Sequence, residues 1–500
     1  MSGRSRVGPA LLVLLSALLH ALSFPPLGFF PLAWLSLVPF FVGLTRVRPL
    51  AGASLGLIWS LGVGLGTAQF LPSMISDYFS TGVLTAWGTA TLATLWTGLW
   101  YGAFGGWLAW LSRAGPPGPF TIACGFGACE YGRTISWLAN PWALSATTQA
   151  PWLHALQLAD LGGPVVIGMA LAAFNACIAN SLLLAPTPRC ARPALLGVAV
   201  LAATVGYGEW RLRQDFSSGA AVEVALVQGA VPRDQRWNAR FRSENLARQL
   251  ALAEQAERVD TDLILFSELA FDFPFEQGRS ELTRAAARGH ADWMVGAEGV
   301  LDLLVLRRQF NSFYVVRGNE IVDRYDKVAL MPFSETNPFR GVVDLGRDSY
   351  SRGAAHRPVE SSVGPVGVLL CNEAMLPHYA RIETLRGAGL LANPANDEWF
   401  GRAGAAHQLA IVALRAVENR RYLVRPTLTG FTAVVDPFGR VIERAAYGAE
   451  TVLTASVHTS NAVTPYHRIH DALPLSASGF ALAVTLRSAR RGNSRGGRAC

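Results

Sequence analysis

The chain has 500 residues, of which 51% are hydrophobic and only 16% are charged, and its formal net charge at pH 7 is +8. This balance is unusual for a soluble globular protein and typical of a chain with membrane-spanning segments. The basic residues flank apolar stretches and form no patch interleaved with aromatic residues, so we expect no nucleic-acid partner.

Long apolar runs with almost no charge occupy the first part of the chain, up to residue 207, and charged residues become frequent after residue 211. Since a membrane span needs roughly 20 apolar residues, residues 1–214 are predicted to form a membrane domain with about seven transmembrane helices. The runs lie at 9–22, 27–44, 50–71, 83–111, 120–132, 158–184 and 194–207. A shorter run at 472–486 predicts a final span within 461–500, followed by an Arg-rich tail.

Arginine residues fall at alternate ends of successive apolar runs, at positions 4 and 6, 46 and 48, 113, and 189 and 192. Basic loop ends tend to stay in the cytoplasm. An odd number of crossings then places residues 215–460 outside the cytoplasm. One further crossing returns the basic tail, which includes Arg498, to the cytoplasm.

Residues 215–460 contain short β-rich runs that alternate with helical stretches, a pattern typical of a layered α/β domain. Strands are predicted at 222–227, 263–266, 293–296, 310–317, 320–325, 366–370, 390–392, 428–435 and 441–443. Helices are predicted at 238–258, 280–288, 379–386 and 407–421. Gly318-Asn319 predicts a hairpin turn between two of the strands.

Lysine and cysteine each occur only once in this second part of the chain. Lys327 is the only lysine among the 43 Lys and Arg residues, and Cys371 is the only cysteine between residues 215 and 460. The lysine side chain ends in a compact ammonium group, whereas arginine ends in a planar, forked guanidinium. A single cysteine thiol in an exported domain is open to oxidation. The two residues therefore point to covalent catalysis, although an Arg-rich composition could also leave them by accident.

Glu268, Lys327 and Cys371 each follow an apolar or β-rich run, a position from which a rigid scaffold presents polar side chains. A Cys thiolate can attack a carbonyl, a carboxylate can take the thiol proton, and a cation can stabilise the oxyanion. These three residues are the predicted catalytic triad. No zinc-type cysteine pattern, phosphate-binding loop or Gly-x-Ser-x-Gly sequence is present, so we expect no metal and no cofactor.

The segments around these residues resemble those of the nitrilase (carbon–nitrogen hydrolase) superfamily. They are Phe266-Ser267-Glu268-Leu269-Ala270, Tyr325-Asp326-Lys327-Val328, Pro332-Phe333-Ser334-Glu335, Cys371-Asn372-Glu373 and 396–401. With Phe24-Pro25-Pro26 and the apolar first part, the whole chain is similar to the apolipoprotein N-acyltransferase family. The resemblance implies a multi-span α-helical membrane domain joined to a nitrilase-like four-layer (αββα) domain.

The resemblance also implies an enzyme of lipoprotein biosynthesis in the bacterial inner membrane, with its catalytic domain facing the periplasm. In such an enzyme Cys371 takes an acyl chain from a phospholipid as a thioester. The N-terminal amine of the lipidated cysteine of an apolipoprotein then accepts it. Glu268 is implied as base and acid and Lys327 as the oxyanion partner, with substrate-binding or supporting roles for Glu335, Trp237, Asn372 and Glu373.

The chain departs from the family pattern beside the predicted triad. The family usually has Pro, Thr and Tyr where this chain has Ser267, Leu269 and Asn372, and often an Asn-rich stretch at 427–430. Because these positions flank the triad, the substrate stays open. Two alternatives remain: a membrane-tethered amidase or hydrolase that passes the acyl group to water, and a non-catalytic membrane binding protein.

Apolar residues follow both Glu268 and Lys327. They can form exposed loops that admit acyl chains at the membrane face, or they can simply pack over the domain. The residues concerned are Phe271, Phe273, Pro274 and Phe275 after the first, and Met331, Pro332, Phe333, Pro338 and Phe339 after the second.

Overall fold

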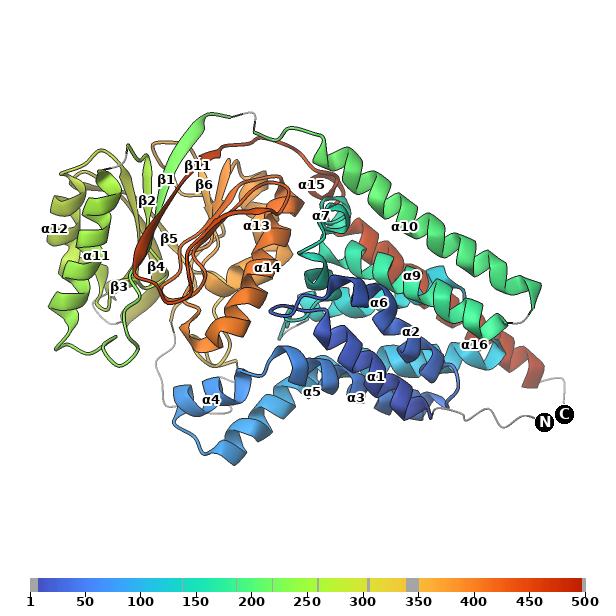
Figure 1. Cartoon of the computed structure of the whole chain (residues 1–500). Helices are drawn as coiled ribbons and strands as arrows, with labels where there is room; N and C mark the ends of the chain where they lie inside the picture. Colours follow the sequence, from blue (N-terminus) through green and yellow to red (C-terminus); the bar gives the residue numbers. More distant parts are fainter. Residues whose placement is uncertain are drawn as a thin grey trace. The chain divides into compact units, whose positions relative to one another are not determined.

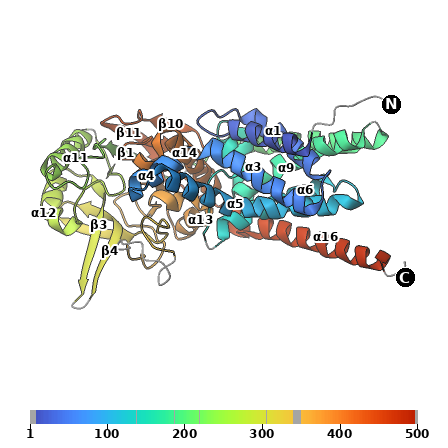
Figure 2. The same cartoon turned by 90° about the horizontal axis from the view of Figure 1, so that it is seen from below.

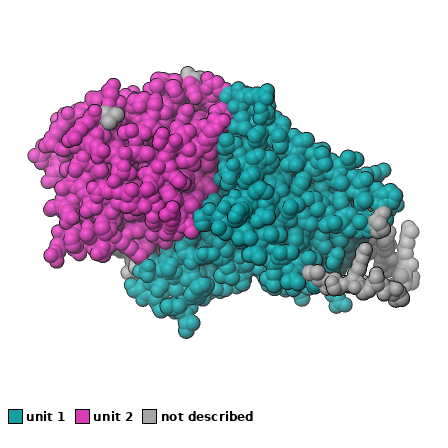
Figure 3. All heavy atoms as spheres, viewed as in Figure 1, with its two compact units in different colours: residues 1–214, 468–500 teal, residues 215–467 magenta. Residues whose placement is uncertain are grey.

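The structure is a computed structural model that describes residues 8–136, 138–185, 187–217, 219–258, 260–303, 306–338 and 350–496. The chain divides into two compact units (Figure 3), and each is described by itself. Unit 1 comprises Met1–Gln214 and Arg468–Cys500, and unit 2 comprises Asp215–His467. Phe339 and Arg498 lie outside the described residues.

Unit 1 is helical (Figures 1 and 2). Its α-helices are α1 (Pro9–Leu22), α2 (Ala33–Leu44), α3 (Pro49–Thr67), α4 (Leu71–Phe79), α5 (Val83–Leu111), α6 (Pro119–Ile135), α7 (Leu153–Leu156), α8 (Ala159–Gly162), α9 (Pro164–Leu184), α10 (Ala191–Leu212) and α16 (Ala472–Gly496). Within the described residues, four segments are long and apolar enough to cross a membrane: Pro49–Thr67, Pro164–Leu184, Pro188–Leu212 and Ala472–Arg490. Pro9–Leu22 and Phe30–Leu44 are shorter apolar helices, so the number of crossings stays a prediction.

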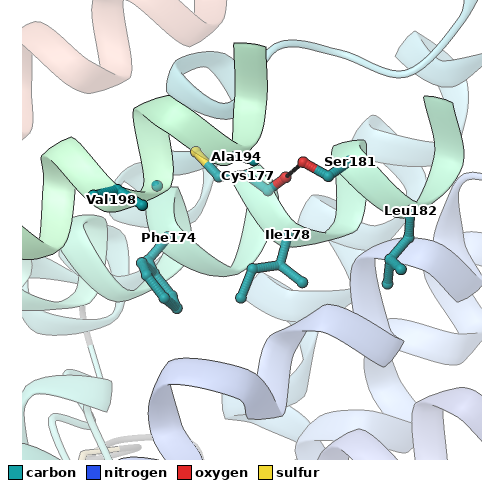
Figure 4. Close-up of a pocket in the computed structure, with 8 residues that line it drawn as sticks. Phe174, Cys177, Ile178, Ser181, Leu182, Ala194 and Val198 are labelled. Atoms are coloured by element: carbon teal, nitrogen blue, oxygen red, sulfur yellow. Dashed lines mark hydrogen bonds between the residues drawn. The ribbon is translucent and has the colours of Figure 1, made fainter. Parts of the chain in front are cut away.

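Glycines allow the helices of unit 1 to approach closely. A Cβ at Gly56 of α3 would lie 2.1 Å from the carbonyl oxygen of Tyr101 in α5, and one at Gly105 would lie 2.4 Å from that of Gly52. Such small residues are typical of packed membrane helices. Between α9 and α10 an apolar groove of about 250 Å³ remains, lined by Phe174, Cys177, Ile178, Leu182, Ala194 and Val198 (Figure 4).

Unit 2 contains two mixed β-sheets. The six-stranded sheet has the order β11-β1-β2-β3-β4-β5, and the five-stranded sheet has the order β10-β9-β8-β7-β6. The strands are β1 (Ala221–Gln228), β2 (Leu263–Leu265), β3 (Asp292–Leu303), β4 (Leu306–Arg317), β5 (Glu320–Asp326), β6 (Val366–Val368), β7 (Leu390–Ala392), β8 (Leu423–Arg425), β9 (Ala433–Val435), β10 (Val441–Arg444) and β11 (Thr451–His458). The α-helices are α11 (Arg242–Glu257), α12 (Phe275–Ala286), α13 (Pro377–Leu385), α14 (Gly401–Asn419) and α15 (Pro465–Ile469), the last of which reaches into unit 1.

The two sheets pack face to face with helices on their outer faces. Alternate residues of a strand point to opposite faces of its sheet. In β1, Val224 and Leu226 join a core shared with Val366 and Val368 of the other sheet, whereas Ala225 faces α11 and α12. The outer face of the second sheet packs against α14 in the same way. The predicted αββα architecture is therefore confirmed.

The strands differ from the prediction in several places. β8 and β11 are additional, and β3 continues to Leu303 as one arm of a long hairpin with β4 (Figure 2). Residues 428–432 are not part of β9, which starts at Ala433. β8 has only three residues, and in β11, the edge strand next to β1, the adjacent Val452 and Leu453 interrupt the alternation of polar and apolar residues. Neither leaves the strong local pattern that identifies a strand.

Candidate active site

The predicted catalytic residues come from three strand ends. Glu268 follows β2, Lys327 follows β5 and Cys371 follows β6. The chain after β2 crosses β3 at Gly296, where a Cβ would lie 2.1 Å from the carbonyl oxygen of Ser267. Only glycine leaves room for this crossing, after which Glu268 reaches Asn311 of β4.

Lys327 lies between two carboxylates. Its Nζ atom donates to Oε1 of Glu268 at 2.8 Å and to Oε1 of Glu335 at 3.0 Å, and its side chain is 2% exposed. An ammonium has three N–H donors, so one remains for a further acceptor. Burial lowers the pKa of Lys327, but the two glutamates and the Cys371 sulfur raise it well above its usual value. The lysine is therefore a fixed positive charge.

Asn311 of β4 completes this arrangement and was not predicted. Its Nδ2 atom donates to Oε1 of Glu268 at 2.9 Å and to Oε1 of Glu335 at 2.7 Å. Burial pushes the pKa of Glu268 upward, but the Lys327 ammonium and the N–H donors outweigh it and hold the net pKa below the usual value. Glu268 is therefore ionised and able to accept a proton.

Cys371 begins the short helical turn Cys371–Met375 and adopts a left-handed backbone conformation, with φ of 48°. Its thiol lies close enough to Glu268 to help lower the pKa of that carboxyl. Burial and the Glu268 anion raise the pKa of the Cys371 thiol, and Lys327 opposes them only in part. The resting group is therefore the thiol, which needs the adjacent base when it attacks.

Glu373 joins the lysine segment to the nucleophile segment. Its carboxylate accepts the main-chain N–H groups of Val328 (2.8 Å), Ala329 (2.9 Å) and Leu370 (2.8 Å). The Tyr325 hydroxyl donates to both of its oxygens, at 2.9 and 3.0 Å. Burial raises the pKa of Glu373 to about 7, although these backbone donors oppose the shift.

Asn372 lies in the same turn, and its side-chain Nδ2 donates to the carbonyl oxygen of Ala329 at 2.9 Å. Its main-chain N–H is in the first turn of a helix, where no intrahelical acceptor exists. Within the part of the chain that the structure describes, this N–H donates to no other group. It is thus available to a bound oxyanion.

Trp237 is not brought to the triad. Its side chain is 50% exposed, its φ is 65°, and its ring lies 5.4 Å from the guanidinium of Arg236. Arg236 contacts the base segment, because its Nη2 donates to the carbonyl oxygen of Leu269 at 3.0 Å. The Trp237 indole therefore lies beside Arg236, which contacts the segment that carries Glu268.

The aromatic residues after Glu268 pack inside the unit. Phe271, Phe273 and Phe275 are at most 3% exposed and belong to the core beneath α11 and α12. Of the two alternatives for this loop, packing is the one observed. Phe333, in contrast, is 40% exposed. Among the described residues, no group of three or more His, Cys, Asp or Glu is arranged to hold a metal ion.

Comparisons with known proteins cover nearly the whole chain. Residues 223–464 match the carbon–nitrogen hydrolase family, and residues 16–177 match the N-terminal domain of apolipoprotein N-acyltransferase. The chain is 27% identical to the apolipoprotein N-acyltransferase of Geobacter metallireducens, over 96% of this chain and 95% of that protein. It is 31% identical to the apolipoprotein N-acyltransferase of Azotobacter vinelandii, over 92% of this chain and 91% of that protein. With both domains matched and relatives aligned end to end, the chain belongs to the apolipoprotein N-acyltransferase family.

Proposed function

We propose that this protein transfers a fatty acyl chain from a phospholipid to the N-terminal amine of the lipidated cysteine of an apolipoprotein, with Cys371 as the thioester carrier. Membership of the family supports the overall reaction. One observation carries the assignment of residues: Lys327 is bonded to Glu268, and the Cys371 side chain lies close enough to both to shift their pKa values. This is the geometry of a nucleophile, its base and an oxyanion cation.

In the first half-reaction the Cys371 thiol gives its proton to Glu268 as the sulfur attacks the ester carbonyl carbon of the phospholipid. The negative charge on the carbonyl oxygen is stabilised by the remaining N–H of Lys327 and by the Asn372 N–H. Collapse of this intermediate breaks the ester C–O bond. Glu268 returns the proton to the leaving alkoxide, so a lysophospholipid departs and a thioester remains on Cys371.

In the second half-reaction the free amine of the apolipoprotein attacks the thioester carbonyl and Glu268 accepts a proton from the nitrogen. An amide forms, the C–S bond breaks, and the proton returns from Glu268 to the Cys371 sulfur. Glu335 and Asn311 take no part in bond making. They hold Lys327 and Glu268 in place through the contacts described above.

The same proposal includes the topology. The candidate spans support a membrane protein, and the relatives place it in bacteria. The alternating arginine-rich ends support cytoplasmic termini and a periplasmic unit 2. A periplasmic reporter fused after residue 460 should be active and one fused after residue 500 inactive. The reverse result overturns this orientation.

The reaction is tested by incubating the purified, detergent-solubilised protein with phospholipid and measuring its intact mass. We expect an acyl adduct that maps to Cys371 and leaves when a diacylglyceryl-cysteine peptide is added. Cys371→Ala is the matched control and should carry none. An adduct that only hydrolyses favours the tethered hydrolase, and absence of any adduct while Cys371 remains open to alkylation refutes the phospholipid donor.

A further inference from the structure

The loop formed by residues 393–397 lies against the main chain of Cys371. The Cys371 N–H donates to the carbonyl oxygen of Pro394 at 2.8 Å, and Nδ2 of Asn393 donates to the Cys371 carbonyl oxygen at 3.2 Å. The loop therefore contacts both the main-chain N–H and the main-chain carbonyl of Cys371. A non-glycine residue in the left-handed region is strained, so Cys371 needs such contacts to hold its conformation.

Arg425 holds this loop from the neighbouring strand. β8 lies beside β7, whose end leads into residues 393–397. The Arg425 side chain is fully buried, and its guanidinium donates to Oδ1 of Asn393, to Oδ1 of Asp397 at 2.6 Å and to Oε1 of Gln408 at 2.9 Å. Its planar fork therefore fastens both ends of the loop at once.

Asp397 has little freedom to move away from Arg425. Its side chain is fully buried, and Gly430 covers its other side. A Cβ at Gly430 would lie 2.2 Å from Oδ2 of Asp397 and 2.6 Å from its Cβ. Gly430 and the Arg425–Asp397 pair therefore form one packed arrangement.

We propose that Arg425 is a positioning residue, which acts through Asn393 and Asp397 to hold the loop 393–397 against Cys371 and so keep the left-handed backbone conformation of Cys371 as the thiolate forms. This inference rests on the proposed role of Cys371 as nucleophile. The charges that face the sulfur are the Glu268 and Asp397 carboxylates and the Lys327 ammonium. The Lys327 ammonium can offset the two anions only while Cys371 keeps the conformation that places its sulfur near that charge.

The test compares Arg425→Lys with Arg421→Lys in the full-length protein in detergent. Arg421 is also buried, but among the described residues its guanidinium donates only to the main-chain oxygens of Ala388, Asn419, Arg420 and Ala462, none of which belongs to the loop. Lysine keeps the charge at both positions and removes the fork. The rate of alkylation of Cys371 by iodoacetamide is followed against pH by peptide mass spectrometry, which separates Cys371 from the other cysteines.

We expect Arg425→Lys to slow alkylation at pH 7 by about tenfold and to move the midpoint of its pH profile up by about one unit. Arg421→Lys should match the wild type. Gly430→Ala, which crowds Asp397, should shift the profile in the same direction. Equal profiles for Arg425→Lys and Arg421→Lys overturn the inference, as does an unchanged profile in Gly430→Ala if Arg425→Lys does not fold.

Alkylation needs no acyl donor. A wild-type protein that forms no acyl adduct therefore defeats the proposed function, while the role of Arg425 is still measured. A loss of thermal stability in Arg425→Lys with an unchanged alkylation profile of the folded protein assigns Arg425 to structure alone and also overturns the inference.

Discussion

The Nζ atom of Lys327 lies 2.8 Å from Oε1 of Glu268, and both side chains are buried. The same ammonium contacts Glu335 at 3.0 Å. Removing one member of a buried ion pair leaves an unpaired charge, which is strongly destabilising. Variants that keep the charge or the shape are therefore the informative ones at this site.

Lys327→Arg should lower the rate of thioester formation by at least roughly 100-fold, the usual effect of losing one oxyanion donor. The planar guanidinium cannot place one N–H at the oxyanion while it also bonds to Glu268 and Glu335. The acyl adduct on Cys371 is measured by intact mass over time.

Arg324→Lys is the matched control for this substitution, because Arg324 pairs with Asp326 on the same strand and has no contact with the triad. It should leave the rate within about twofold of the wild type, in the range of a partly exposed pair. A Lys327→Arg protein that is folded and nearly as active as the wild type contradicts the oxyanion role.

Asn311→Leu should shift the acidic limb of the pH–rate profile to higher pH. The Asn311 amide donates to the ionised carboxylate of Glu268 and so helps to hold its pKa down. Without this donor the pKa of Glu268 rises, and a larger share of the base is protonated at a given pH. Initial rates of thioester formation across the pH range measure the shift.

Asn245→Leu offers a control of the same chemistry. Asn245 is 4% exposed and donates to Asp272 at 3.1 Å, away from the triad. Its pH profile should keep the wild-type acidic limb even if stability falls. A common shift in both variants would mean that the effect is not specific to Glu268.

Glu373→Gln should destabilise unit 2 by about 1–3 kcal/mol and reduce turnover. A carboxylate can accept all four N–H and O–H groups that face Glu373, whereas an amide turns its own NH₂ toward some of them and leaves them unsatisfied. Tyr325→Phe removes one donor only and should cost about 0.5–1.5 kcal/mol. Denaturant unfolding measures both, and an equal cost for the two variants contradicts the anchoring role of Glu373.

The buried carboxyl group of Glu383 is expected to make the stability of unit 2 depend on pH. Its side chain is fully buried, and neither oxygen has a hydrogen-bond partner among the described residues. Burial, and next the Glu373 carboxylate, raise its pKa from 4.5 to about 8. A raised carboxyl pKa favours the folded state below pH 4.5, and this stabilisation is lost as pH rises through about 8. Glu373 and Glu418, with pKa values of about 7, act in the same direction.

Glu383→Gln should therefore unfold at a higher temperature than the wild type at pH 8.5 and at a similar temperature at pH 4.5. Each kcal/mol corresponds to about 2–4 °C for a unit of this size. The exposed Glu320→Gln is the control and should follow the wild type at both pH values. A constant difference between Glu383→Gln and the wild type at both pH values would falsify the assignment.

Much of the candidate site could be predicted from the sequence. Glu268, Lys327 and Cys371 each follow a short apolar strand, and the scarcity of lysine and cysteine drew attention to two of them. Asn311 and Arg425 could not be found in this way, because each is a single polar residue at or within a strand. The neighbouring residues do not indicate whether such a side chain faces the solvent, the hydrophobic core or the active site.

The sequence by itself determined what depends on local pattern: the apolar helices, the alternating strands and the residue types of the triad. Only the tertiary structure decided that Asn311 joins Glu268 to Glu335 and that Phe271, Phe273 and Phe275 pack inside. It also decided that Arg425 reaches the loop around Cys371. Hydrophobic periodicity reports which face of an element is buried. Which strand ends meet depends instead on pairing between distant segments, and one strand's pattern does not record its partner.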